Sequence, residues 1–220
     1  MRTITGAVLI ALLPCAVGAR PASGGEIAGR IHAPAEEVAR QPPRYLVGPR
    51  RAGRQSEDVV RRGPQDVVIW VEGLVTTPPE AATPAVMAQE GEEYVPHVLP
   101  VQAGTLVSFP NRDDYYHNVF SVVAGDRFDL GRFASGESAD QRFTKPGVVV
   151  VRCEIHSRMK AYILVVDSSV FDRASEDGGY RLAGVPAGRW TVKAWHPTKG
   201  EQQRIVEVPR EGRIELDFTF

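Results

Sequence analysis

The most chemically distinctive stretch of this sequence carries three metal-binding side chains within one short segment. Cys153, His156 and Met159 follow the pattern C-x-x-H-x-x-M, and His117 lies upstream of them. The short spacing allows one tight loop at a strand end to turn all three side chains towards one centre. Two imidazoles, a thiolate and a weak axial thioether form the ligand set of type 1 copper sites. The pattern therefore predicts a copper site, because zinc, the main rival metal, would rarely recruit Met.

The N-terminus has the composition of an export signal. Arg2 supplies a short basic region, residues 7–13 are apolar, and residues 17–19 are small. We expect cleavage of a signal peptide formed by residues 1–19 and a periplasmic protein. A lipid anchor on Cys15 is the less favoured alternative, because a proline directly precedes this cysteine. The apolar run is too short to span a bilayer, and no later segment is apolar enough to do so.

Cleavage would leave Cys153 as the only cysteine of the mature chain. Such a chain cannot form an internal disulfide, and a free thiol is a liability in an oxidising compartment. Metal ligation is one role for this thiol, and the alternative is a buried, inert cysteine in a strand. His117 and His156 have the alternative of ordinary loop or surface residues, and Met159 that of a core residue. The joint presence of all four favours the metal site.

The composition excludes several classes of function. The chain has 220 residues, of which 43% are hydrophobic and 24% charged, and its net charge is -1. These values are ordinary for a globular protein and do not imply a nucleic-acid partner. The sequence contains neither a phosphate-binding loop nor a dinucleotide fingerprint. Its five histidines are too few for the additional copper cluster of a multicopper oxidase. We therefore expect a protein that is not an enzyme.

Short β-branched and aromatic runs, separated by turn residues, predict an all-β sandwich. Strands are expected at residues 26–31, 66–72, 86–89, 94–101, 105–109, 118–123, 148–153, 160–167, 180–182, 190–195, 204–208 and 213–220. Residues 33–65 are rich in Arg and Pro and are expected to form an irregular surface loop. Residues 76–83 have the composition of a linker. Glycines mark residues 125–136 as a looser region.

The central part of the chain resembles the cupredoxins. Residues 104–119 are similar to the first ligand segment of that family, and the 153–159 loop has the short spacing of amicyanin. The resemblance covers about residues 85–167 and implies a Greek-key sandwich holding one type 1 copper ion. The two histidines and the cysteine would be equatorial ligands and Met159 the axial one. The resemblance also implies that Asn118 hydrogen-bonds to the Cys-bearing loop and ties the two ligand segments together.

The flanks resemble a second family. Residues 25–31 and 177–190 are similar to parts of carboxypeptidase-regulatory-like domains, which are small transthyretin-like sandwiches. Neither flank has enough strands to fold alone. We therefore expect residues 25–75 and 167–220 to form one sandwich, into which a cupredoxin domain of residues 76–166 is inserted. The simpler alternative is a cupredoxin followed by a separate tail domain.

These features together predict an exported type 1 copper protein that carries single electrons between redox partners. The alternatives are a copper-binding or carrier protein without redox turnover, and an adhesion or scaffold module. Arg158 and Lys160, which flank Met159, would favour a partner protein that is acidic near the copper port, and the alternative is that they are ordinary solubilising charges. His97 is expected to be a surface histidine, and the remaining two histidines, His32 and His196, have no ligand-like sequence neighbours.

Overall fold

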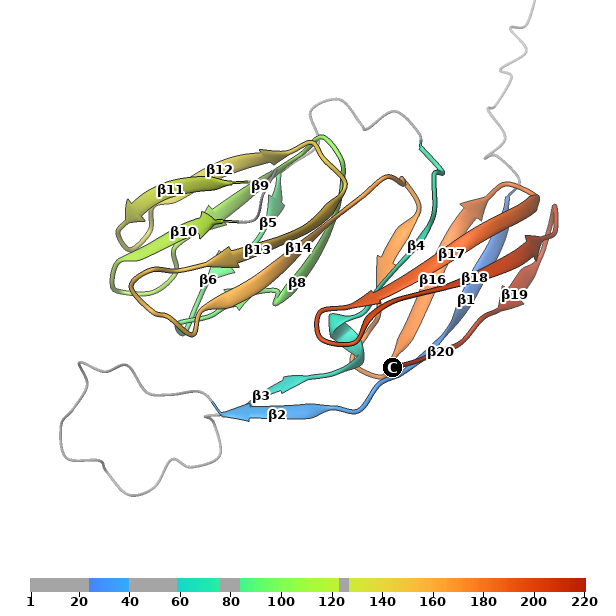
Figure 1. Cartoon of the computed structure of the whole chain (residues 1–220), viewed down its shortest axis with the longest axis horizontal. Coiled ribbons are helices and arrows are strands. Elements are labelled where there is room, and N and C mark those ends of the chain that lie inside the picture. Colours follow the sequence, from blue (N-terminus) through green and yellow to red (C-terminus); the bar gives the residue numbers. More distant parts are fainter. Residues whose placement is uncertain (1–23, 40–58, 76–83, 123–126) are drawn as a thin grey trace, which may run out of the picture.

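The computed structural model describes residues 24–39, 59–75, 84–122 and 127–220. Within these residues the protein is built from β-strands, with a short 3-10 turn, η1, at Pro64–Asp66. The strands form two sandwiches that lie side by side (Figure 1), each with its own hydrophobic core. The predicted all-β class is therefore confirmed. The expected signal peptide and the linker of residues 76–83 lie outside the described residues.

The first sandwich carries all four predicted metal ligands and fits the expected Greek-key arrangement. Its larger sheet has the strand order β11-β10-β13-β14-β8, formed by Phe128–Phe133, His117–Ser121, Gly147–Arg152, Lys160–Val166 and Val98–Gln102. The facing sheet has the order β12-β9-β5, formed by Ser138–Phe143, Thr105–Pro110 and Ala85–Val86. A short ribbon pairs β6 with β7, formed by Ala88–Gln89 and Tyr94–Val95.

The second sandwich combines strands from both ends of the chain. One sheet contains β1, β16, β19 and β20, formed by Gly25–His32, Gly179–Val185, Arg213–Glu215 and Phe218–Thr219. The other has the order β15-β4-β17-β18, formed by Phe171–Arg173, Val68–Val71, Gly188–His196 and Gly200–Val208. Strand β1 pairs antiparallel with β16 and parallel with β19 and β20. Segments before and after the first sandwich thus share one sheet, while the domain boundaries and the transthyretin-like resemblance stay predictions.

Strand β14 links the two sandwiches because both of its faces are buried, one in the first core and the other in a cluster shared with the second sandwich. Successive side chains of a strand point to opposite faces. Ala161, Ile163 and Val165 therefore join the core of the first sandwich. The alternating residues Tyr162, Leu164 and Val166 pack in a separate cluster with Val68, Trp70 and Trp195 of the second sandwich. This double burial explains why β14 is a continuous apolar run rather than an alternating one.

The prediction of an irregular loop over residues 33–65 is wrong at both ends of that segment. Strands β2 (Glu36–Ala39) and β3 (Val59–Arg62) form an antiparallel ribbon, which extends below the first sandwich in the view of Figure 1. The register aligns Glu36 with Arg62, a pair of opposite charges that favours such pairing. Residues 40–58 lie outside the described part of the chain.

Three expected strands are each divided, among them 213–220, which forms β19 and β20, and the strands β11, β12 and β15 were not expected. The strand expected at 94–101 consists of β7 and β8, because Pro96 between them cannot donate a ladder hydrogen bond. The strand expected at 86–89 begins as β5 and continues as β6. The region expected to be loose, residues 125–136, contains β11, which pairs with β10. No helix among the described residues is long and apolar enough to cross a membrane.

Candidate metal centre

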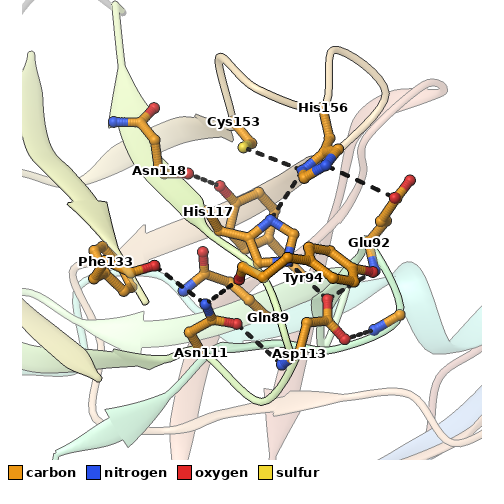
Figure 2. A network of polar contacts seen from close by, with 12 residues as sticks. Gln89, Glu92, Tyr94, Asn111, Asp113, His117, Asn118, Phe133, Cys153 and His156 are labelled. Atoms are coloured by element: carbon orange, nitrogen blue, oxygen red, sulfur yellow. Dashed lines mark hydrogen bonds and ion pairs between the residues drawn. The ribbon is translucent and has the colours of Figure 1, made fainter. Parts of the chain in front are cut away.

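Three predicted ligands meet at one end of the larger sheet, where its strands stop. His117 is the first residue of β10, and Cys153 directly follows the last residue of β13. These strands are antiparallel neighbours, so the start of β10 and the end of β13 lie at the same end of the sheet. The His117, Cys153 and His156 donor atoms all lie within 4.8 Å of one another. Figure 2 shows His156 and Cys153 on one loop, turned towards His117 from β10.

The loop between β13 and β14 holds its own shape through the backbone. The amide N–H of Met159 donates to the carbonyl of His156 at 2.9 Å, and that of Cys153 donates to the carbonyl of Met159 at 3.3 Å. Met159 is buried and belongs to the same hydrophobic cluster as Cys153. The loop is therefore closed tightly enough for its side chains to converge, while thioether ligation by Met159 stays a prediction.

The ring of His117 is fixed by a carboxylate that the sequence did not reveal as part of the site. His117 is 0% exposed, and its Nε2 donates to Asp113 Oδ2 at 2.7 Å. Asp113 also accepts the backbone N–H groups of Gly91 at 2.6 Å and Glu92 at 3.0 Å. Because an ionised carboxylate can only accept, the proton of the His117 ring lies on Nε2. The lone pair of Nδ1 therefore points away from Asp113 and is available to a metal ion.

The protonation states around His117 also suit metal binding. Burial lowers the pKa of His117, although the neighbouring Asp113 carboxylate acts in the opposite direction. Burial alone would raise the pKa of Asp113, but the N–H donors of Glu92 and Gly91 and the His117 ring hold it below its ordinary value. A neutral imidazole backed by an ionised carboxylate is the form in which histidine binds metals.

His156 is also backed by a carboxylate, at a longer distance. Its Nε2 lies 3.7 Å from Glu92 Oε1, and the two side chains are 15% and 19% exposed. This distance is too long for a hydrogen bond, and Glu92 Oε1 is buried without a hydrogen-bond partner. Glu92 also has a positive φ of 59°, unusual for a residue with a side chain. The Gly91–Glu92 turn thus reaches both imidazoles, His117 through Asp113 and His156 through Glu92.

The donor atoms face one another as if around a cation. The two Nδ1 atoms of His117 and His156 lie 3.0 Å apart, and Cys153 Sγ lies 3.9 Å from Nδ1 of His156. With its ring proton on Nε2, His117 presents the lone pair of Nδ1, and the His156 Nδ1 at this distance shares either a proton or a cation with it. A thiolate adds negative charge at the same point. The residues present therefore fit a soft or borderline metal ion such as copper.

Asn118 joins the two ligand segments, as the cupredoxin resemblance implied. Its Oδ1 accepts the backbone N–H of Glu154 at 3.3 Å, directly after Cys153. Its Nδ2 donates to Asp129 Oδ1 at 2.8 Å and to the carbonyl of Gly131 at 3.0 Å. The predicted hydrogen bond to the Cys-bearing loop is thus confirmed. It fixes the position of Cys153 relative to β10.

Three further residues complete the surroundings of the site. Asn111 donates to the carbonyls of Tyr115 at 2.7 Å and Phe133 at 3.2 Å, which holds the segment before His117. The Tyr115 ring packs edge-on against the rings of His117 and His156, with centroids 5.1 and 5.6 Å away. Tyr94 is buried and its hydroxyl donates to the carbonyl of Asn118 at 2.8 Å.

Tyr94 stays neutral next to the thiol. Burial, and to a lesser degree the charge of Cys153, raise the pKa of Tyr94 well above its ordinary value. The phenol therefore acts as a hydrogen-bond donor within the core. The sequence signal for Tyr94 and Asp113 was weak, because both act through contacts between segments that are distant along the chain.

The other histidines do not join the centre. The expectation of a surface position for His97 is wrong, because its side chain is 15% exposed and its Nδ1 lies 2.8 Å from Oδ2 of the buried Asp66. His32 is exposed and lies 3.7 Å from Asp217. His196 is buried in the second sandwich. Among the described residues, His117, Cys153 and His156 form the only group of this kind close enough to share a metal ion.

Comparison with known proteins finds similarity to copper proteins among solved structures. No family model and no curated protein matches the chain. Similar structures include the Cu-containing nitrite reductase NirK from Thermus scotoductus SA-01, at 30% identity and a TM-score of 0.37 over 42% of this chain and 25% of that one. A purple cupredoxin from Nitrosopumilus maritimus is 22% identical, with a TM-score of 0.34 over 37% of this chain and 98% of that one. A reduced Cu(I) form of an amicyanin mutant is 23% identical, with a TM-score of 0.37 over 40% of this chain and 86% of that one.

Proposed function

We propose that this protein binds one type 1 copper ion and carries single electrons between redox partners. The observation that supports this best is the convergence of two imidazole Nδ1 atoms and one thiol within 4.8 Å. His117, Cys153 and His156 would hold the ion, and Met159 would be a fourth, weaker ligand. When bound, copper would supply one-electron redox chemistry between its Cu(I) and Cu(II) states.

The contribution of the protein is to hold its ligands in place before the metal arrives. Asp113 fixes the ring of His117, and Asn118 fixes the loop that bears Cys153. Both ligands are buried on rigid strand ends, so the site would change little when an electron arrives or leaves. Small rearrangement means a low barrier to electron transfer. Tyr115 covers both imidazole rings and would limit the access of water.

The burial of the donors also distinguishes this proposal from a copper carrier without redox turnover. Cys153 and His117 are both buried. A protein that releases its ion to a recipient needs donor atoms that the recipient can reach, and buried donors make such exchange slow.

We also propose export to the periplasm and a redox partner that is acidic near the copper port. The basic and apolar pattern of residues 1–19 supports export. The exposed Arg158, which precedes the predicted axial ligand, supports an acidic partner. Electrostatic complementarity of this kind increases association rates more than affinity.

Visible absorption of the purified protein after addition of Cu(II) tests the copper proposal. An intense thiolate-to-copper band is expected in the wild type. Cys153→Ser should lose this band, and the control His32→Gln should keep it, because His32 is exposed and lies in the second sandwich. A wild-type protein that binds Cu(II) without this band would contradict type 1 ligation. A protein that holds only Cu(I) and readily yields it to a chelator would indicate a carrier instead.

A further inference from the structure

A second concave site lies between the two sandwiches. It is a cavity of about 250 Å³ lined by residues from both. His97 and Lys160 line it from the first sandwich, and Asp66 and Lys199 line it from the second. Cavities at domain interfaces are common ligand sites. Since a water molecule occupies about 30 Å³ of liquid, this space suits a ligand of modest size.

The charges that line the cavity are mainly positive. Arg158, Lys160 and Lys199 have no carboxylate within ion-pair distance among the described residues, and Glu36 is the opposing acid that remains. The ammonium group of Lys160 lies 4.7 Å from the centre of the Tyr162 ring, which holds it over that ring. The lining thus has a surplus of positive charge, and a concave wall concentrates the resulting field.

The other charged groups in the lining already have partners. The carboxylate of Asp66, which is buried, accepts the Nδ1–H of His97 at 2.8 Å. Arg62 lies 3.6 Å from Glu93, which is outside the lining. The Asp66 carboxylate keeps its negative charge but is engaged by His97, and the Arg62 guanidinium is engaged by a carboxylate outside the lining. An anion that enters the cavity meets the three unpaired cations, which outnumber the lining carboxylates of Glu36 and Asp66.

Part of the cavity wall is apolar. The ring of Tyr162 lines it and packs edge-on against the ring of His97, with centroids 5.4 Å apart. Pro34 and Pro197 add apolar surface from the second sandwich. Tyr162 also packs against Trp195, with ring centroids 5.8 Å apart, so its position is fixed by the cluster between the sandwiches. A ligand with an apolar body would remove this surface from water.

We propose that this cavity binds a small carboxylate with an apolar body, held by Lys199, Arg158 and Lys160 through its charged group and by Tyr162 through its apolar part. Charge-assisted hydrogen bonds from these cations would fix the carboxylate. The cavity stands on the packing of the two sandwiches and needs no metal ion. This proposal can therefore be tested on the metal-free protein, independently of the proposed copper function.

Isothermal titration calorimetry of the metal-free full chain at neutral pH tests this proposal with benzoate as the probe. Benzamide supplies the same ring without the charge, and inorganic phosphate supplies a charge without the ring. Benzoate should bind at least about tenfold more tightly than either, because one charged hydrogen bond to a partly buried cation is worth about one to two kcal/mol. Equal affinity for benzoate and benzamide, or for benzoate and phosphate, would overturn the proposal, as would the absence of benzoate binding.

Two matched variants locate the binding. Lys199→Gln should weaken benzoate binding on the order of tenfold. Lys145→Gln should leave it unchanged, because Lys145 is exposed and does not line the cavity. Both positions are on the surface, so the fold should survive, and the thermal unfolding midpoint of each variant checks this. Fluorescence of the wild type gives a second readout, since a ligand against Tyr162 would perturb the neighbouring Trp195. Equal weakening in both variants would place the benzoate elsewhere and refute the assignment.

Discussion

Replacement of Asp113 by Asn separates the role of its charge from the role of its shape. The carboxylate accepts the Gly91 N–H on Oδ1, and the Glu92 N–H and the His117 ring on Oδ2. An amide has one oxygen in place of two. If that oxygen keeps the Oδ2 position, the Gly91 N–H loses its acceptor and faces an NH₂ group. Loss of a hydrogen bond to a charged group costs about 1.5–3 kcal/mol of folding stability.

The same change should weaken copper binding. The bond to His117 becomes a neutral hydrogen bond, which is worth about half of a charge-assisted one. Loss of a partner that orients a metal ligand typically reduces metal affinity by about 10- to 100-fold. Competition with a Cu(I) chelator measures this affinity. The control Asp140→Asn changes an exposed carboxylate on β12 and should bind copper as the wild type does. Equal affinities for Asp113→Asn and the wild type would refute the positioning role of Asp113.

The pH dependence of stability gives Asp113 a second test in the metal-free protein. The pKa of Asp113 is lowered in the folded state. Its ionised form therefore stabilises the fold above its unfolded pKa of about 3.9, and this contribution is lost as the pH falls through the lower folded value. The difference in free energy of unfolding between wild type and Asp113→Asn, measured with urea, should be largest near neutral pH and should decrease below about pH 4. A difference that is constant with pH would contradict a role for the carboxylate charge.

Three further predictions concern stability. Asn118→Ala removes the tie to Glu154 N and two other hydrogen bonds, and should cost about 1–3 kcal/mol in urea unfolding and speed copper loss to a chelator. Trp70→Ala removes a buried ring from the cluster between the sandwiches, and should cost about 3–5 kcal/mol and separate the unfolding into two transitions. Burial lowers the pKa of His196 in the folded state. The neutral form therefore stabilises the fold above the unfolded pKa of about 6.5, and this contribution is lost as the pH falls from there through the lower folded pKa. His196→Gln should flatten the dependence of stability on pH below about pH 6.5.

Each of these has a clear contrary outcome. An Asn118→Ala protein with wild-type copper retention would show that the loop holds its shape without the tie. A single, unchanged transition in Trp70→Ala would show that the interface contributes little to stability. An identical pH profile in His196→Gln would assign the loss of stability at low pH to other groups.

The sequence was most informative where the chemistry lies within one segment. The C-x-x-H pattern pointed to Cys153 and His156, which the structure brings together with His117. The unbroken β-branched run of residues 148–151 predicted β13, which positions Cys153. Strand β1 at the N-terminus was also predicted, because its residues alternate between polar and apolar. These signals are local, so a single sequence carries them.

The features that the sequence did not reveal depend on contacts between distant segments. The role of Asp113 depends on the Gly91–Glu92 turn, whose N–H groups donate to its carboxylate although the turn lies more than 20 residues earlier in the chain. The partner of His97 is Asp66, which belongs to the other sandwich. The strand β11 was hidden by its glycine, because a glycine with a positive φ at Gly131 looks like a turn although the strand continues through it.

A potentiometric titration of the copper-loaded protein, followed through its visible band, tests the central claim most directly. An electron carrier with one copper ion should lose the band on reduction and recover it fully on oxidation. The band should follow a one-electron curve with a slope of about 59 mV per tenfold change in the ratio of oxidised to reduced protein. Release of the copper on reduction, or a band that does not return, would contradict electron transfer at the His117, Cys153 and His156 centre.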